Sequence, residues 1–258
     1  MKRVQYNYKT KEIKCRVGTQ EIYGVAYIPQ TCSKIPLAIF AHELGATHRS
    51  GIPYAEALAS CGIAAYTFDF RGGSASSRSD GDTDSMSVMT EADDICSVLD
   101  EASTWNFVDA EHIVLIGASH GGMASAIAAS RRPNDLCALI LLYPALVTYD
   151  AVHEKYKSID EVPCSFWLGD LIHVGKHFVT DSWNYDVYAD MSKFKKPVLI
   201  LHGDKDKVVD LSYSERAAAT YPDCDFHVMH NAGHEFSGEN FEAAMGYIDS
   251  FLQERALT

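Results

Sequence analysis

The sequence predicts an α/β protein in which a mostly parallel sheet carries helices on both faces. Short, continuously apolar runs alternate with segments of helical spacing along most of the 258 residues. An uninterrupted apolar run of about five residues is typical of a strand buried on both faces, and strands that alternate with helices are typical of a parallel sheet. We therefore expect a single α/β domain over residues 1–258.

The first strands are of a different kind. Residues 3–28 alternate between polar and apolar side chains and end at Pro29, which predicts an antiparallel hairpin. A loop rich in Gly, Ser and Asp runs from residue 71 to about residue 84. The other expected strands, all short apolar runs, cover residues 37–41, 63–68, 113–116, 138–143, 197–201 and 226–229. The expected helices cover residues 54–61, 91–102, 121–130 and 243–252.

One segment, approximately residues 147–196, interrupts this order. It is rich in aromatic side chains and far longer than the loops of about 2–6 residues usual in α/β units. One helix of the sheet layer must lie within it. We interpret the rest as a cap inserted over the strand ends, because insertions in open α/β sheets tend to line the ligand crevice. The alternative is a structural excursion with no role at the site.

Charge and hydropathy exclude several classes of function. The net charge of −13 opposes binding to nucleic acids and gives no attraction to anionic membranes. The basic N-terminus precedes no apolar region of the kind found in signal peptides, and no window of 18 apolar residues exists. We expect a cytoplasmic protein that binds neither nucleic acid nor membranes.

The cysteine pattern gives no sign of disulfides or metal. Seven cysteines are present, an odd number, and no CxxC motif occurs. Most have apolar sequence neighbours, so we expect small buried hydrophobic side chains in a reducing compartment. The cysteines are Cys15, Cys32, Cys61, Cys96, Cys137, Cys164 and Cys224.

The strongest chemical signal is the G-x-S-x-G sequence around Ser119. It directly follows the apolar run 113–116 and precedes the helix that begins at Gly121. A serine on a sharp strand-to-helix turn has strained backbone angles, so Gly117 and Gly121 supply the small neighbours that the turn needs. The turn would hold the hydroxyl at a helix N-terminus, where a developing anion is favoured. The alternative is a glycine-rich turn that only requires a positive φ.

A serine nucleophile needs a base, and a histidine base needs a carboxylate to orient it. We favour His234 among the 11 histidines because it lies in a glycine-containing loop just past the last strand. His202 and His230 are alternatives at strand ends that we interpret as structural. Asp204 and Asp206 both follow the penultimate strand, and Asp204 could simply shape the turn. The chain order Ser, Asp, His is the order expected for an elbow on a parallel sheet.

An acyl-transfer site also needs two backbone donors for the oxyanion. We expect one from the amide of His120, which follows the nucleophile. The second should come from the loop after the strand 37–41, which has the sequence HELGA.

The sequences HELGATHRS, TFDFRGGSASSRSDG, LIGASHGG, ILHGDKDKVV and NAGHEF together resemble the α/β-hydrolase superfamily, and within it the bacterial feruloyl and cinnamoyl esterases and their uncharacterised relatives. The resemblance covers nearly the whole chain. It implies an eight-stranded sheet with a small inserted cap and a triad of Ser119, Asp206 and His234. It also implies an oxyanion hole from the Leu44 and His120 amides, and a cap that shapes the acyl pocket.

Two departures from the pattern concern the site. This superfamily usually has His-Gly in the oxyanion loop, and Glu43 here brings a negative charge to that place. His120 stands where the esterases often have Gln, which matters less because its amide is the group required. His173 and His177 have a helical metal-ligand spacing, but no third ligand is near, so we expect two polar residues on the cap.

The hypothesis that follows is a serine carboxylesterase for small, moderately apolar or aromatic acyl esters, without a cofactor or metal. A peptidase or amidase is the first alternative. Peptidases on this fold usually carry a large extra domain, for which 258 residues leave no room. A ligand-binding protein on a hydrolase fold is the second alternative, and Glu43 is its only support. We expect a small-molecule ester as partner, and an exposed cap or edge strand leaves room for a homodimer.

Overall fold

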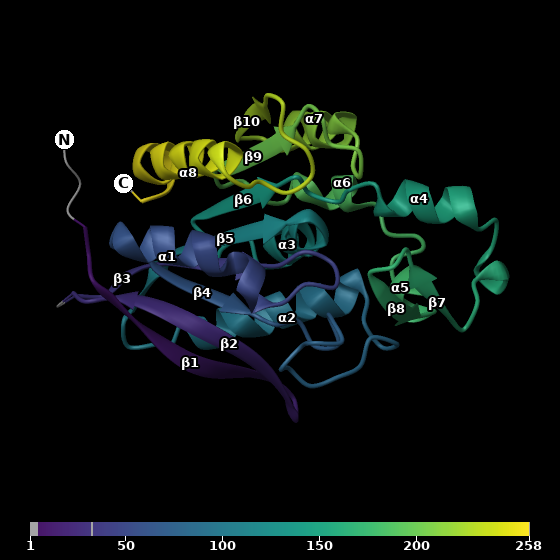
Figure 1. Cartoon of the computed structure of the whole chain (residues 1–258), viewed down its shortest axis with the longest axis horizontal. Helices are drawn as coiled ribbons and strands as arrows, with labels where there is room; N and C mark the ends of the chain where they lie inside the picture. The colour runs from purple at the N-terminus through teal and green to yellow at the C-terminus, as the bar shows by residue number, and fades with distance from the viewer. Residues whose placement is uncertain (1–4, 32, 258) are drawn as a thin grey trace.

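The computed structural model describes residues 5–31 and 33–257 and has an eight-stranded sheet at its centre (Figure 1). The strand order is β1-β2-β4-β3-β5-β6-β9-β10. The strands are β1 (Tyr8–Val17), β2 (Gln20–Pro29), β3 (Ile35–Ala41), β4 (Ala64–Phe68), β5 (Val108–Ala118), β6 (Ala138–Leu142), β9 (Val198–Gly203) and β10 (Cys224–Met229). β2 pairs antiparallel with β1 and β4, and the other pairs are parallel. The predicted fold class is confirmed.

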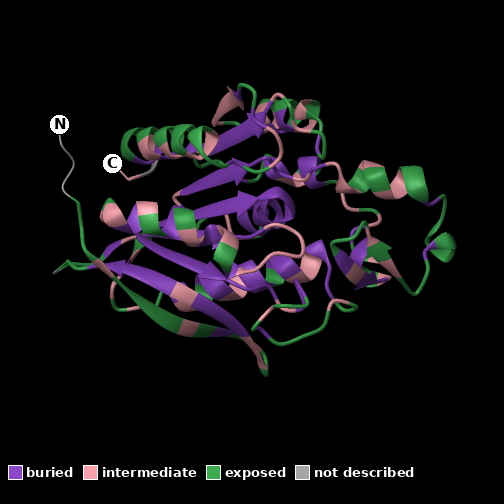
Figure 2. Cartoon of the chain, viewed as in Figure 1, coloured by how far each residue is buried: buried purple, intermediate pink, exposed green. Residues whose placement is uncertain are grey.

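Two layers of helices cover the sheet. Helices α1 (Ile52–Ser60) and α8 (Glu239–Phe251) pack on one face. Helices α2 (Val88–Ala102), α3 (Ser119–Arg131), α6 (Val187–Met191) and α7 (Leu211–Thr220) pack on the other. Successive strand residues point to opposite faces, so Leu37 and Ile39 join one apolar cluster while Ala38 and Phe40 join the other. Figure 2 shows the central strands and α3 buried, and α1 and α8 exposed on their outer sides.

Helix α3 holds the residues of the predicted elbow and is buried from Ser119 to Ser130. Its sequence is mostly Gly, Ala and Ser, and these small residues let it pack closely on the sheet and against α2 and α6. Helix α2 begins at a capping box in which Ser87 and Thr90 satisfy each other's backbone amides. The turn at Ser119 therefore rests on a closely packed base.

The segment 147–196 contains helix α4 (Thr148–Lys155), a 3-10 turn (Ile159–Glu161), the hairpin β7 (Ser165–Leu168) and β8 (Ile172–Gly175), and helices α5 (His177–Thr180) and α6. Helix α6 packs against α3 and is the expected sheet-layer helix. The elements before it lie beyond the end of the sheet where β6 leads into α4 (Figure 1). They share an apolar cluster with two residues from outside the segment, the buried Met86 and the partly buried Leu44.

The expectation that the cysteines are buried is mostly wrong. Cys15 is buried, whereas the next five described cysteines are partly or well exposed. Cys61 follows the last turn of α1, and Cys164 precedes the small hairpin, so both lie outside the core layers. Cys32 lies outside the described residues. No helix within residues 5–31 and 33–257 has the length and hydropathy needed to span a membrane.

Candidate active site

Ser119 lies at the junction of β5 and α3 with a φ of +51°, a left-handed conformation that is unusual for serine. The flanking glycines make this turn possible. A methyl group on Gly117 would overlap the Ser125 side chain, and one on Gly121 would overlap the carbonyl oxygen of His42. The two glycines therefore allow the serine turn to press against both its own helix and the loop after β3.

The structure brings Ser119, His234 and Asp206 together from three separate strand ends. The Ser119 hydroxyl lies 2.8 Å from Nε2 of His234, although the two residues are 115 positions apart. Nδ1 of the same ring lies 2.7 Å from Oδ2 of Asp206. In this arrangement the neutral imidazole donates through Nδ1 and accepts the serine proton at Nε2. A hydrogen-bond chain with this geometry is able to activate a serine hydroxyl.

Asp206 is held by donors on both of its oxygens. Its Oδ1 accepts from the amides of Val208 (2.8 Å) and Val209 (3.0 Å), and Oδ2 also lies 3.1 Å from Nε2 of His202. Burial acts to raise the pKa of Asp206, but the hydrogen bonds from Val209, His234 and Val208 outweigh it and keep the pKa below its ordinary value. The carboxyl group therefore stays ionised beside His234.

The rejected alternatives have other partners. Asp204 accepts from the Asn231 amide (2.7 Å) and lies near the exposed His230 (3.1 Å), so it joins the loop that follows β9 to the loop that follows β10. His202 is fully buried, with Nδ1 2.7 Å from the Ser214 hydroxyl and Nε2 3.0 Å from the Val209 carbonyl oxygen. Burial lowers its pKa, so a neutral His202 supports Asp206 from behind.

The loop after β3 is fixed by His42. Nδ1 of His42 donates to the carbonyl oxygen of Glu43 (2.7 Å), and Nε2 accepts from the Phe70 amide (3.2 Å). The loop at 69–73 thus packs beside the loop after β3. Leu44 and His120, the two predicted amide donors, both line the cavity that contains Ser119. The first-turn amide of His120 also has no partner within its helix.

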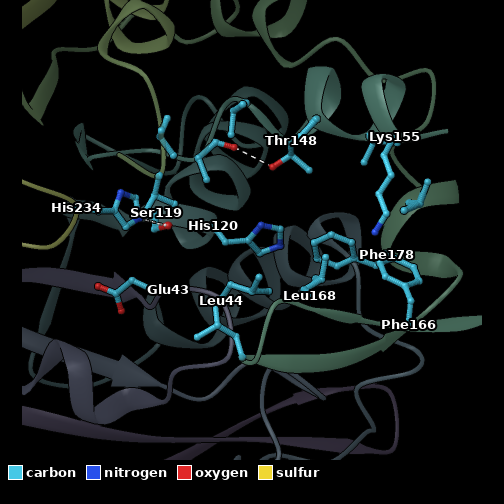
Figure 3. Close-up of a pocket in the computed structure, with 18 of the residues that line it drawn as sticks. Glu43, Leu44, Ser119, His120, Thr148, Lys155, Phe166, Leu168, Phe178 and His234 are labelled. Atoms are coloured by element: carbon cyan, nitrogen blue, oxygen red, sulfur yellow. Dashed lines mark hydrogen bonds between the residues drawn. The ribbon is translucent and has the colours of Figure 1, made fainter. Parts of the chain in front are cut away.

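The cavity at Ser119 has a volume of about 410 Å³, and its walls are mostly apolar (Figure 3). Tyr156, Phe166 and Phe178 contribute aromatic walls from the segment 147–196. Lys155 stands at the far end from Ser119, with its Nζ 5.2 Å from the ring centroids of both Tyr156 and Phe166. The space therefore suits a moderately long, apolar group.

Behind the cavity wall, His120 meets a buried acid from helix α2. Nε2 of His120 lies 3.4 Å from Oε2 of Glu91, and both side chains are almost fully buried. The His120 ring stacks on Phe178 with a centroid distance of 5.4 Å. Burial lowers the pKa of His120 to about 4 and raises that of Glu91 well above its ordinary value. Burial therefore favours the neutral form of both groups.

Comparison of sequences identifies the family. The sequence profile of the prolyl oligopeptidase family matches residues 53–256. The chain belongs to this family. Its curated relatives include the human and mouse monoacylglycerol lipase ABHD6, each 24% identical over 181 residues. The aligned region covers 54% of this chain and 54% of each relative, so the chain spans about half the length of the curated relatives it matches.

Solved structures agree with the predicted α/β-hydrolase fold. Est1E from Butyrivibrio proteoclasticus with bound ferulic acid is 22% identical, covers 95% of this chain and 100% of its own, and has a TM-score of 0.86. Mouse alpha/beta hydrolase domain-containing protein 10 is 22% identical, covers 95% and 99%, and has a TM-score of 0.77. The Pyrococcus furiosus esterase Pf2001 is 18% identical, covers 97% and 92%, and has a TM-score of 0.73. The prediction that the chain is an α/β hydrolase is confirmed.

Two residues near the cavity at Ser119 were not predicted from the sequence. Tyr143 follows β6, has a φ of +37° and packs edge-on against His234 at a centroid distance of 4.9 Å. Its position just past the carboxyl end of a central strand is the signal that could have found it. Glu91 lies on the apolar stripe of α2 formed by Val88, Ala92 and Ile95, where a charged residue is out of place.

His173 and His177 do not share a helix. His173 lies in β8, with Nδ1 3.3 Å from Asp84, and His177 begins α5, with Nδ1 3.2 Å from Asp181. The two side chains are therefore not one helical turn apart, although they are four positions apart in the sequence. Within the described part of the chain, no group of three or more His, Cys, Asp or Glu side chains could hold a metal ion.

Proposed function

We propose that this member of the prolyl oligopeptidase family is a serine carboxylesterase for small esters with apolar or aromatic acyl groups. The observation that carries the proposal is the hydrogen-bond chain from Ser119 through His234 to Asp206, which opens into an aromatic-walled cavity. A hydroxyl with a base and an orienting carboxylate suits acyl transfer, and an apolar cavity suits an acyl group that has no charge beside the ester.

The mechanism assigns one step to each group. His234 takes the Ser119 proton at Nε2 while Oγ attacks the ester carbonyl carbon. The amides of Leu44 and His120 stabilise the negative oxygen of the tetrahedral intermediate, and one such donor contributes about 3–4 kcal/mol to the transition state. The intermediate then breaks its bond to the alcohol oxygen, which takes the proton from His234. Water, deprotonated by the same imidazole, releases the acid from the acyl-enzyme.

The acyl group would lie against the aromatic residues of the segment 147–196, which we propose to be a cap on a single hydrolase domain. Est1E, a structural neighbour, binds ferulic acid, a cinnamic-type acid with an aromatic ring. A hydroxycinnamoyl ester is one of the acyl classes that the cavity at Ser119 would accept, because Tyr156, Phe166 and Phe178 offer ring faces for stacking.

A panel of p-nitrophenyl esters that vary in acyl length and aromaticity tests the proposal. We expect aromatic and medium-chain acyl esters to have the highest kcat/KM, and Ser119→Ala to lose at least about 10³-fold in kcat. Ser97→Ala, which removes a hydroxyl on α2 away from the cavity, is the matched control. Full activity of Ser119→Ala would rule the mechanism out.

Amide hydrolysis is the second candidate, because the family takes its name from a peptidase. The same triad could cleave an amide with His234 protonating the leaving amine. Parallel assays with aminoacyl-p-nitroanilides separate the two, and anilides cleaved faster than the matched esters would favour the peptidase. A fluorophosphonate probe that leaves Ser119 unlabelled in the folded protein would instead indicate a ligand-binding protein.

A further inference from the structure

Glu43 has a carboxylate oxygen that the protein leaves without a partner. The Tyr143 hydroxyl donates to Oε1 at 3.0 Å, whereas the buried Oε2 accepts no hydrogen bond from the described residues. A buried carboxylate oxygen without a donor is costly, and a cationic group bound beside it would offset that cost. Figure 3 shows Glu43 beside Ser119 and His234, at the end of the cavity opposite Lys155 and Phe166.

A second depression, which we call the aromatic hollow, lies on this side of the oxyanion loop. It has a volume of about 350 Å³ and shares Glu43, Leu44, Leu171 and Glu235 with the cavity at Ser119. Its remaining walls are largely aromatic. The aromatic residues are Tyr54, Tyr143, Phe236 and Phe241. The hollow therefore adjoins the cavity that contains Ser119 and does not include the aromatic walls of the 147–196 segment.

The charge in the aromatic hollow is of one sign. Glu43 and Glu235 both line it, and among the described residues no Lys, Arg or His does. Glu235 follows His234 with a φ of +71° and is exposed. After burial, which is the largest cause, both carboxylates also raise the pKa of the Tyr54 and Tyr143 hydroxyls. The negative charges of Glu43 and Glu235 therefore both act within the aromatic hollow.

The position of the hollow assigns it to the leaving group. An ester bound at Ser119 has an acyl arm and an alcohol arm, and His234 must reach the alcohol oxygen to protonate it. Tyr143 packs edge-on against His234, and Phe236 packs on Tyr143 with a centroid distance of 4.9 Å. The alcohol arm, directed toward His234, would enter the hollow that these rings line.

We propose that the aromatic hollow binds a cationic, ammonium-bearing alcohol portion of the substrate, with Glu43 and Glu235 as specificity-determining residues. This inference rests on the proposed esterase function. Ring faces and carboxylates together bind substituted ammonium groups, because the ring faces and the acids both carry negative potential and the rings also contact the methyl groups.

A pair of esters of equal shape tests the proposal. Butyrylcholine and 3,3-dimethylbutyl butyrate differ only in whether the branched atom is a charged nitrogen or a neutral carbon. We expect kcat/KM to be about tenfold higher for the choline ester, a ratio that corresponds to about 1.4 kcal/mol. Glu43→Gln and Glu235→Gln each lower this ratio, and the double variant brings it close to one. Glu215→Gln, an exposed carboxylate on α7, leaves the ratio at the wild-type value.

The outcomes separate the inference from the function on which it rests. Equal kcat/KM values for the two esters, with hydrolysis that still depends on Ser119, would overturn the cation site and leave the esterase standing. A glycerol ester cleaved as fast as the choline ester would show that the acids accept hydroxyl groups instead, and would also overturn it. Absence of hydrolysis of these esters and of the p-nitrophenyl panel would count against the esterase itself.

A binding measurement does not require turnover. Choline chloride titrated into the Ser119→Ala protein is expected to bind about tenfold more tightly than into the same protein carrying Glu235→Gln, as followed by calorimetry. Because Glu235 is exposed, Glu235→Gln is not expected to disturb folding, so a lower affinity for choline would report the loss of the carboxylate charge. Equal affinity in the two proteins, or no binding in either, would contradict the proposal.

Discussion

Replacing His120 by Gln is expected to change how stability depends on pH. Burial, with a smaller effect from the nearby His42, lowers the pKa of His120 to about 4, whereas an unfolded histidine titrates near pH ~6.5. Between these two pH values His120 is protonated in the unfolded chain and neutral in the folded protein. The free energy of unfolding therefore falls as the pH falls through this window, and is unaffected by His120 above it.

The size of the effect follows from the two pKa values. A fall from the ordinary 6.5 to about 4 corresponds to about 3.4 kcal/mol when the window is fully crossed. Between pH 7.5 and pH 5.0 the His120 contribution is about 2 kcal/mol. Urea denaturation at these two pH values, followed by tryptophan fluorescence, measures it. We expect His120→Gln to lose about 2 kcal/mol less than the wild type on acidification.

Glu91→Gln is the companion variant and has the opposite sign. Burial and the nearby Asp94 raise the pKa of Glu91, so the folded protein keeps its proton while the unfolded chain ionises. This contribution is present at low pH and is lost as the pH rises above about 4.5, and Glu91→Gln removes that loss. If His120 and Glu91 instead formed a charged pair, acidification would cost His120→Gln more than the wild type. That result would refute the neutral pair.

The other predictions concern the candidate site. Asp206→Asn is expected to lower kcat on p-nitrophenyl butyrate by about 10⁴-fold, and a loss below tenfold would contradict its orienting role. Gly121→Ala places a methyl group on the carbonyl oxygens of residues 41 and 42 and should destabilise by about 1–3 kcal/mol, seen as a lower Tm. Gly246→Ala, where the space is open, is its control and should stabilise by up to about 1 kcal/mol; equal Tm values in the two variants would be inconsistent with the overlap. Phe178→Ala removes an aromatic wall and should raise KM for aromatic acyl esters about tenfold relative to acetyl esters, a ratio that a purely structural role would leave unchanged.

The sequence predicted the sheet and the positions of Ser119 and His234 because their signals are local. Each follows a predicted strand, as do Asp204 and Asp206, and the carboxyl ends of parallel strands meet at one edge of a sheet. The choice of Asp206 over Asp204 depended in part on the resemblance to the hydrolases. The glycines beside Ser119 mark a turn that other residues could not form. Their proximity follows from topology, while their catalytic role stays a prediction until it is assayed.

The parts that escaped prediction depend on contacts between distant segments. Helix α7 buries little besides Ser214 and Ala217, so its sequence has no strong apolar stripe. The partnership of Glu43 with Tyr143 joins residues 100 positions apart, and no pattern in either neighbourhood indicates it. The exposure of Cys61 was likewise missed, because apolar sequence neighbours do not show which way a side chain at a helix end faces.

The aromatic walls of the cavity lie in a part of the chain that can evolve separately from the candidate catalytic residues. Tyr156, Phe166 and Phe178 all enter the cavity from one uninterrupted stretch between β6 and β9, whereas the hydroxyl, imidazole and carboxylate groups come from outside it. Substitutions in that stretch can reshape the cavity without disturbing the reactive side chains. Related proteins can therefore come to accept different acyl groups while they keep the same hydroxyl, imidazole and carboxylate.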